Sequence, residues 1–198
     1  MAVSIHGLPA ALATAVEDAF SDVAVAGNVA VVGVDLSNGP DLVLLQHASW
    51  DDAIGAARDA FFAMQRAARS LAEGGGGCLI VLVPVHGLRT SRGCGVEAVV
   101  GSFLTTAAQV AAVELGSLGV RVNVLAVGPL EGEVDARTTD GVPIGRLARP
   151  ADVGAACAML ASPQAGFVTG AVVPVDGGYA VTKAVGGSPF TDASTAAQ

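Results

Sequence analysis

The chain has 198 residues, a length typical of one domain, and 52% of them are hydrophobic, which is enough for one continuous core. Acidic residues outnumber basic residues by 18 to 10, giving a formal net charge of −8 at pH 7. Nucleic acids and anionic membranes require clustered positive charge, so neither is expected as a partner. No unbroken apolar run approaches the roughly 18 to 20 residues of a membrane-spanning helix, so a soluble protein is expected.

The cysteines and the first residues bear on the compartment. Cys78, Cys94 and Cys157 are odd in number and far apart, which is more typical of reduced thiols than of disulfides. Residues 1–20 have no basic start before their apolar stretch and soon turn acidic, so no secretory or transit signal is expected. A cytoplasmic location is therefore expected.

Short β-branched runs alternate with longer alanine-rich stretches along the whole chain, a pattern typical of α/β domains. Most of the short runs are continuously apolar, as expected for parallel strands that are covered on both faces. The longer stretches carry apolar residues at helical spacing. Strands are predicted at 2–5, 28–34, 42–45, 78–83, 120–125 and 171–175, and helices at 9–20, 51–71, 96–116 and 151–161.

The organisation along the chain is simple. Residues 1–182 are predicted to form a single domain, without internal repeats or long linkers. Residues 183–198 are small and polar and lack periodicity, so we expect a flexible C-terminal tail. Gly74 to Gly77 follow a predicted helix and precede a predicted strand, which indicates a flexible helix exit rather than a phosphate-binding loop.

Three motifs follow one another in the C-terminal third of the chain. They are VRVNVLAVGPL from Val120, PIGRLARPADVGAACAMLAS from Pro143, and GFVTGAVVPVDGGY ending at Tyr179. In this order they resemble the short-chain dehydrogenase/reductases, especially the β-ketoacyl reductase-like branch. The resemblance implies a Rossmann-like, doubly wound parallel sheet with helices on both faces. The chain resembles a truncated member, reduced at its N-terminal side, because the family's second strand and the helix after it have no counterpart between Phe20 and Asp41.

The resemblance also implies four catalytic positions. In the family a tyrosine protonates the substrate carbonyl, a lysine lowers the tyrosine pKa, a serine polarises the carbonyl and an asparagine holds a relay water. Counting back from the VRVN segment places the tyrosine at Glu97 and the lysine at Gly101. The serine falls on Pro84 or Val85, and the asparagine falls on Ala57.

None of these residues can take over the family's roles. A carboxyl group at Glu97 would ordinarily be ionised near pH 7 and unable to donate a proton, and Gly101 has no side chain. The chain has no tyrosine before Tyr179, so no shift of the alignment restores the proton donor. Tyr179 and Lys183 spell a YxxxK pair, but they follow the VDGG motif, which the resemblance places at the far side of the sheet. A tyrosine packed on an oligomer surface and a solvated lysine are expected there.

Cofactor binding is not predicted for this chain. Dinucleotides need a glycine-rich turn after the first strand, because backbone N–H groups must approach the pyrophosphate closely. Here the turn is His6–Gly7–Leu8–Pro9, with a single glycine. Asp35 could imitate a ribose-binding acid, although a strand-end cap is the favoured interpretation. The family's NNAG segment is matched only by residues 45–48, so NAD(P) is expected in an active partner and not here.

Other polar residues give weaker signals. Three histidines, His6, His47 and His86, lie where predicted strands end, but they lack the spacing of metal ligands, so no metal site is predicted. Arg89 and Arg92 lie where the family's substrate loop would be. They could contact an anion or belong to a solvated or interface loop.

The chain departs from the family at the expected catalytic and cofactor-binding positions. It retains the sequence patterns of the regions that build oligomers in the family. The expected interface residues are Phe61, Phe62, Val100, Phe103, Leu104, Ala107, Val172 and Tyr179. The hypothesis is a non-catalytic subunit that forms a hetero-oligomer with an active NAD(P)-dependent short-chain dehydrogenase/reductase, whose substrates would be 3-oxoacyl or 3-hydroxyacyl thioesters. The alternatives are a homo-oligomeric pseudoenzyme that binds a small molecule, and an atypical oxidoreductase that uses Glu97, His86 or Tyr179.

Overall fold

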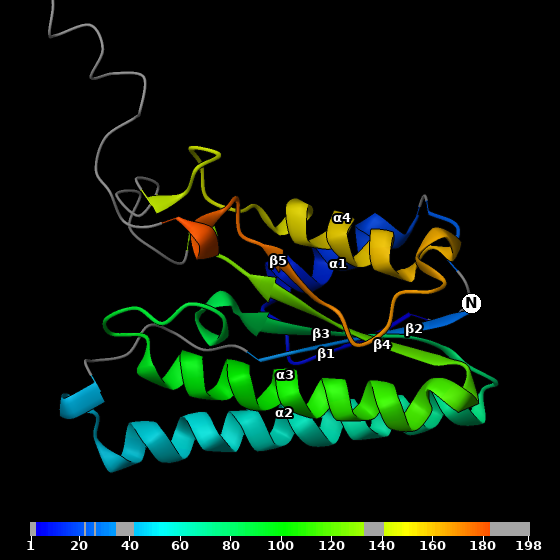
Figure 1. Cartoon of the computed structure of the whole chain (residues 1–198), viewed down its shortest axis with the longest axis horizontal. Coiled ribbons are helices and arrows are strands. Elements are labelled where there is room, and N and C mark those ends of the chain that lie inside the picture. Colours follow the sequence, from blue (N-terminus) through cyan, green and yellow to red (C-terminus); the bar gives the residue numbers. More distant parts are fainter. Residues whose placement is uncertain (1–2, 22, 26, 35–41, 133–140, 183–198) are drawn as a thin grey trace, which may run out of the picture.

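The computed structural model describes residues 3–21, 23–25, 27–34, 42–132 and 141–182 (Figure 1). The strands are β1 (Val3–His6), β2 (Asn28–Gly33), β3 (Gly77–Pro84), β4 (Val120–Val127) and β5 (Val172–Val175). The helices are α1 (Ala10–Ser21), α2 (His47–Glu73), α3 (Gly95–Leu115) and α4 (Pro150–Ala161). Every predicted helix and all predicted strands but one are present, with bounds shifted by a few residues. The predicted tail, 183–198, lies outside the described residues.

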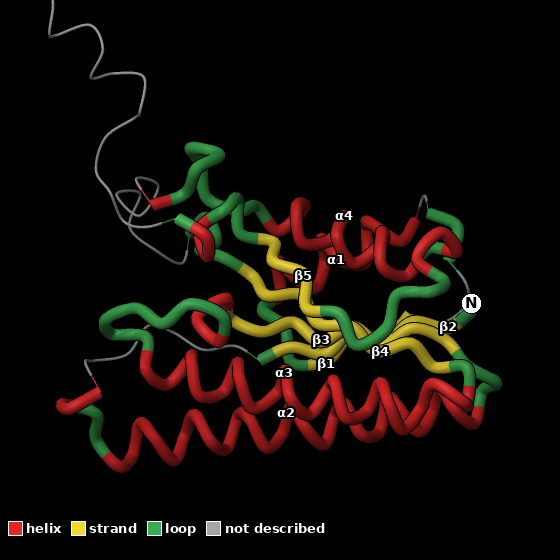
Figure 2. Tube along the Cα trace, in the orientation of Figure 1, coloured by secondary structure: helices red, strands yellow, loops and turns green. Residues whose placement is uncertain are grey.

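The five strands form one parallel sheet in the order β1-β2-β3-β4-β5. The central strand β3 is buried along nearly its whole length, and its Val81 is paired with Val32 of β2 and Val124 of β4. Figure 2 shows the sheet between two layers of helices. Continuous apolar runs are expected on strands covered in this way, so the predicted Rossmann-like α/β fold is confirmed.

The helices reveal how this sheet relates to a doubly wound sheet. Helices α1 and α4 cover one face, and α2 and α3 cover the other (Figures 1 and 2). In a doubly wound sheet the chain moves outward from a central strand in two directions, so helices after strand 1 and strand 4 lie on opposite faces. Here α1 and α2 also lie on opposite faces, although the strand order runs in one direction.

Crossovers on the two faces consequently have opposite hands, whereas nearly all such crossovers in proteins are right-handed. Because α1 and α4 share a face, the crossovers through these two helices have one hand, and the crossovers through α2 and α3 have the other.

The strand predicted at 42–45 is wrong. Leu42–Leu44 form the short 3₁₀ helix η1, and Val43 is 90% exposed. Both sides of β3 are occupied by β2 and β4, so this segment cannot pair with the central strand. The match of residues 45–48 to the family's NNAG segment is wrong for the same reason. The strand that precedes α2 is β2, which ends at Gly33.

The glycine run before β3 is closely packed, contrary to the flexible exit predicted from its composition. Gly76 has φ +113°, and a Cβ atom there would lie 2.6 Å from the carbonyl oxygen of Gly119. A Cβ atom on Gly77 would lie 2.3 Å from the carbonyl oxygen of Asn28. Only glycine fits where these backbones approach one another, so the run fixes the start of β3 beside β2 and β4.

Candidate functional site

The carboxyl end of β3 gathers three of the four positions that the resemblance marks as catalytic. Pro84 ends β3 and leads into the 3₁₀ helix η2 (Val85–Gly87), against which α3 packs. Gly101 makes the close approach possible, since a Cβ atom there would lie 3.1 Å from the Pro84 carbonyl oxygen. Glu97 is one turn earlier on the same helix. Ala57, the fourth position, is buried on α2 and lines a groove with Val100 of α3.

Glu97 differs from the expectation of an ordinary ionised carboxylate. Only 2% of the residue is exposed, and neither carboxyl oxygen accepts a hydrogen bond within the part of the chain that the structure describes. Burial raises the pKa of Glu97, while its own backbone amide and the nearby imidazole of His86 oppose the shift. The protonated form is therefore favoured more than in an exposed glutamate.

Tyr179 was expected at the far side of the sheet, and this expectation is wrong. The 3₁₀ helix η6 (Tyr179–Val181) follows β5 and returns the chain to the loop before α3. The Tyr179 hydroxyl lies 3.4 Å from the Ser91 hydroxyl, and its ring lies 6.0 Å from the imidazole of His86, centroid to centroid. Arg89 donates a hydrogen bond to the Tyr179 carbonyl and lies over its ring. Lys183, the other half of the YxxxK pair, is outside the described residues.

His86 thus lies beside both Glu97 and Tyr179, so the structure brings together the three residues of the rearranged-site alternative. Arg89, predicted to contact an anion or to lie in a solvated or interface loop, instead ties that loop to η6. No local sign in the sequence indicated that Tyr179 would lie near His86. Their approach depends on the path of the chain after β5, which returns to the loop before α3.

The turn after β1 does not fit a dinucleotide pyrophosphate. Three residues separate His6 at the end of β1 from Ala10 at the start of α1. The side chain of Leu8 fills the space over Gly33 at the end of β2, with its Cδ2 atom 2.1 Å from where a Gly33 Cβ would lie. Pro9 offers no N–H at the helix start, where a phosphate would need one. Asp35, the candidate ribose ligand, is outside the described residues.

The three histidines lie in three different elements. His6 ends β1, His47 begins α2 and His86 lies in η2. Within the described residues, no group of three or more His, Cys, Asp or Glu side chains could hold a metal ion.

The predicted interface residues fall into three groups by exposure. Val100 and Leu104 are buried in the core between α3 and the sheet, and of these two only Val100 also lines the groove between α2 and α3. Phe62 and Phe103 reach the surface with 45% and 46% of their area exposed. Phe61 lies between them, with ring centroids 5.5 Å from Phe62 and 5.9 Å from Phe103. The remaining candidates, Ala107, Val172 and Tyr179, are half-buried.

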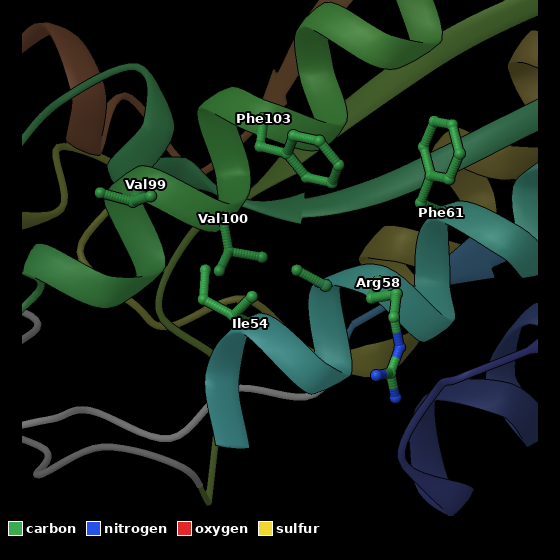
Figure 3. Close-up of a pocket in the computed structure, with 7 residues that line it drawn as sticks. Ile54, Arg58, Phe61, Val99, Val100 and Phe103 are labelled. Atoms are coloured by element: carbon green, nitrogen blue, oxygen red, sulfur yellow. The ribbon is translucent and has the colours of Figure 1, made fainter. Parts of the chain in front are cut away.

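A groove of about 180 Å³ lies on this surface between α2 and α3 (Figure 3). Its lining is apolar except for Arg58, whose guanidinium points away from the other side chains (Figure 3). The lining residues are Ile54, Ala57, Arg58, Phe61, Val99, Val100 and Phe103. Ile54 and Val99 belong to the apolar stripes of the two predicted helices but not to the predicted interface residues, and they continue the apolar surface beyond them.

Comparison with known proteins identifies the family. The family model described as "Enoyl-(Acyl carrier protein) reductase" matches residues 7–180. The chain belongs to the short-chain dehydrogenase/reductase family. This confirms the family to which the sequence motifs pointed.

Two curated relatives align with this chain over only part of their own length. Nodulation protein G of Azospirillum brasilense is 30% identical over 68% of this chain and 58% of that protein. The 3-oxoacyl-(acyl-carrier-protein) reductase of Chlamydia muridarum is 30% identical over 57% of this chain and 48% of that protein. The chain therefore spans about half the length of these curated relatives.

A solved structure shows the same fold over a greater length. The 3-ketoacyl-(acyl-carrier-protein) reductase of Brucella melitensis, described as complexed with NADH, superposes with a TM-score of 0.79. The superposition covers 90% of this chain and 98% of that chain, at 18% sequence identity. The two proteins thus share one fold over most of this chain.

Proposed function

We propose that this chain is a non-catalytic subunit that assembles with an active NAD(P)-dependent short-chain dehydrogenase/reductase. The observation that carries the proposal is the outer face of α3. No charged residue occurs from Val99 to Val113. Val99 and Phe103 are 43% and 46% exposed, and Val110 and Val113 are 51% and 85% exposed. These side chains form an exposed apolar stripe that runs beside the exposed polar residues Ser102, Thr106 and Gln109, and a contiguous exposed apolar stripe is typical of a surface that another protein covers.

The buried side of α3 argues against a membrane-spanning helix as the reason for its apolar character. The segment Gly95–Leu118 has a mean hydropathy of 1.5 and meets the length and composition of a membrane span, which the search for unbroken apolar runs missed. However, Leu104 and Ala108 of this helix are buried in the core with β3 and β4. Because one side of α3 is committed to its own sheet, its exposed side is better suited to another protein surface.

The groove between α2 and α3 extends this face. Its apolar lining and its volume of about 180 Å³ suit one large side chain of a partner. Aromatic residues of another short-chain dehydrogenase/reductase, presented on its own pair of long helices, are the occupants that the proposal expects.

Three of the four positions that the resemblance marks as catalytic support the proposed absence of chemistry in this chain. Ala57, Pro84 and Gly101 offer no acid, base or hydroxyl group, which leaves Glu97 as the acid among the four, and the side chain of Leu8 fills the space over Gly33. In the proposed complex this chain would bind and shield the partner's helices, and the partner would supply NAD(P) and the hydride transfer. The 3-oxoacyl-(acyl-carrier-protein) reductase among its relatives supports 3-oxoacyl or 3-hydroxyacyl thioesters as the partner's substrate class.

A second candidate function has one observation in its favour. His86, Ser91, Glu97 and Tyr179 gather at the carboxyl ends of the strands, where α/β proteins bind ligands. A homo-oligomeric pseudoenzyme would use them to bind a small molecule. In that case the chain purified from its own cells would be a homo-oligomer that retains a small ligand other than NAD(P).

The purified chain alone provides the first test of the proposal. NADH and NADPH fluorescence is recorded during titration with the chain, and reduction of a 3-oxoacyl thioester is followed in parallel, with an active 3-oxoacyl reductase as control. We expect no change in fluorescence and no turnover from this chain. Nucleotide binding with turnover would overturn the proposal in favour of the atypical oxidoreductase.

A further inference from the structure

The first turn of α3 carries a buried carboxyl group in an unusual arrangement. Glu97 is the third residue of the helix, a position from which glutamate commonly reaches back to the backbone N–H of the N-cap residue. Here the N-cap residue is Cys94, and its N–H donates to the Ser91 carbonyl at 3.3 Å. The Glu97 carboxyl instead lies inside the protein, where neither oxygen accepts a hydrogen bond from the described residues.

The surroundings of Glu97 offer little to stabilise a negative charge. The imidazole of His86 in η2 opposes the raised pKa of Glu97, and the Cys94 thiol is the other titratable group that interacts with it. Helix α3 shares its core cluster with apolar residues of β3, β4 and α2, among them Val83, Ala126 and Ala53. An ionised carboxylate that is buried without a hydrogen-bond partner among the described residues is strongly disfavoured.

We propose that Glu97 is a proton-controlled latch for the start of α3. With the carboxyl group protonated, the first turn stays packed against η2. When the proton leaves, the carboxylate moves out to water, and the turn opens together with the loop before it. The latch therefore closes in mild acid and loosens toward alkaline pH.

The direction follows from linkage. Burial raises the pKa of Glu97 in the closed turn, so the closed turn holds its proton more tightly than the open turn. Closure is fully favoured below the ordinary glutamate pKa of about 4.3 and is lost as pH rises through the raised value. Each unit by which the pKa is raised changes the opening equilibrium roughly tenfold.

The latch adjoins the exposed face of α3. Val99 and Phe103 follow Glu97 within two turns, and Gly101 seats the helix against Pro84. If the proposed assembly is correct, opening of the first turn would displace part of the partner-binding groove. This consequence rests on the proposed function, whereas the latch itself is a property of the chain alone.

Hydrogen exchange of the isolated chain tests the latch without any partner. Protection factors of the amides in 95–100 are measured at about pH 5 and about pH 8, after correction for intrinsic exchange. We expect a loss of protection at the higher pH in the natural chain, with a ceiling of roughly tenfold for each unit by which the pKa is raised. Glu97→Gln keeps the shape without the charge and should lose less than about twofold. Glu114→Gln, at an exposed position on the same helix, should behave like the natural chain.

A direct titration of the Glu97 carboxyl carbon by NMR keeps the test decisive if Glu97→Gln folds poorly. A pKa at or below that of Glu114 would overturn the latch, and so would equal loss of protection in the natural chain and in Glu97→Gln. Failure of the latch leaves the assembly proposal standing, because the exchange experiment contains no partner.

Discussion

Helices α1 and α3 cover opposite faces of the same sheet, yet their outer surfaces differ. Each buries one apolar stripe, formed in α1 by Leu12, Val16 and Phe20. The outer side of α1 exposes Thr14, Glu17 and Asp18, as expected for a helix that faces water. The outer side of α3 exposes Val99, Phe103, Val110 and Val113. The buried stripe of each helix packs in the protein's own core. The exposed stripe of α3 has no counterpart on α1, and it is the feature on which the proposed assembly rests.

The largest expected effect is on the α1–α4 side, where packing serves stability alone. A Cβ atom on Gly154 of α4 would lie 2.4 Å from the Ala15 carbonyl oxygen and 3.1 Å from the Ala19 Cβ. Gly154→Ala forces the two helices apart and should lower the free energy of unfolding by about 1–3 kcal/mol, measured by urea denaturation.

Gly55 on α2 is the matched control for that substitution. Nothing lies within 4 Å of a Cβ atom added there, so Gly55→Ala should raise the free energy of unfolding by up to about 1 kcal/mol. Equal effects of the two substitutions would contradict the close α1–α4 contact.

The next prediction compares a charge placed on the outer surface of α3 with a charge placed on the outer surface of α1. Val113 is 85% exposed on α3, so Val113→Glu should change the free energy of unfolding by less than about 0.5 kcal/mol. A charge placed in a desolvated contact should weaken assembly at least about tenfold, or roughly 1.4 kcal/mol, measured by sedimentation of the complex. Thr14→Glu on the outer side of α1 is the control and should leave assembly unchanged. Loss of assembly in both variants, or in neither, would remove the distinction between the two helices.

The smallest effect concerns the start of α4. Hydrogen bonds from Arg146 and from the backbone amide of Arg149 lower the pKa of Asp152 to about 2. The stabilisation is present above the ordinary aspartate pKa of about 3.9 and is lost as pH falls through the lowered value. Because both side chains are partly exposed, Asp152→Asn should cost less than about 1 kcal/mol at pH 6. The difference from the natural chain in urea denaturation should shrink as pH falls from about 4 toward 2, and a difference that stays constant over this range would assign the effect to packing.

Much of the fold was predictable because long, periodic elements reveal themselves locally. The stripe through Val96, Val100 and Leu104 predicted α3, and continuous apolar runs predicted β3 and β4. The strand prediction at 42–45 failed because four apolar residues are too few to show a helical or strand period. Only the structure shows that β2 and β4 occupy both sides of β3.

The candidate site was less predictable because its features depend on contacts between distant segments. The resemblance predicted that Glu97 stands where the family has its tyrosine, but nothing in the sequence indicated that its carboxyl group is buried without a hydrogen-bond partner among the described residues. The return of η6 past Arg89 and Ser91 likewise left no local signal. The single-glycine turn was predicted, whereas the side chain of Leu8 over Gly33 is seen only in the structure.

Native mass spectrometry of the tagged chain, purified from its own cells, tests the central claim most directly because it reports partner, stoichiometry and bound nucleotide together. The account predicts a mixed dimer or tetramer with a second short-chain dehydrogenase/reductase, with one NAD(P) for each partner chain and none for this chain. A homo-oligomer that carries one NAD(P) per chain would contradict it, since the turn containing Leu8 would then have to bind a pyrophosphate.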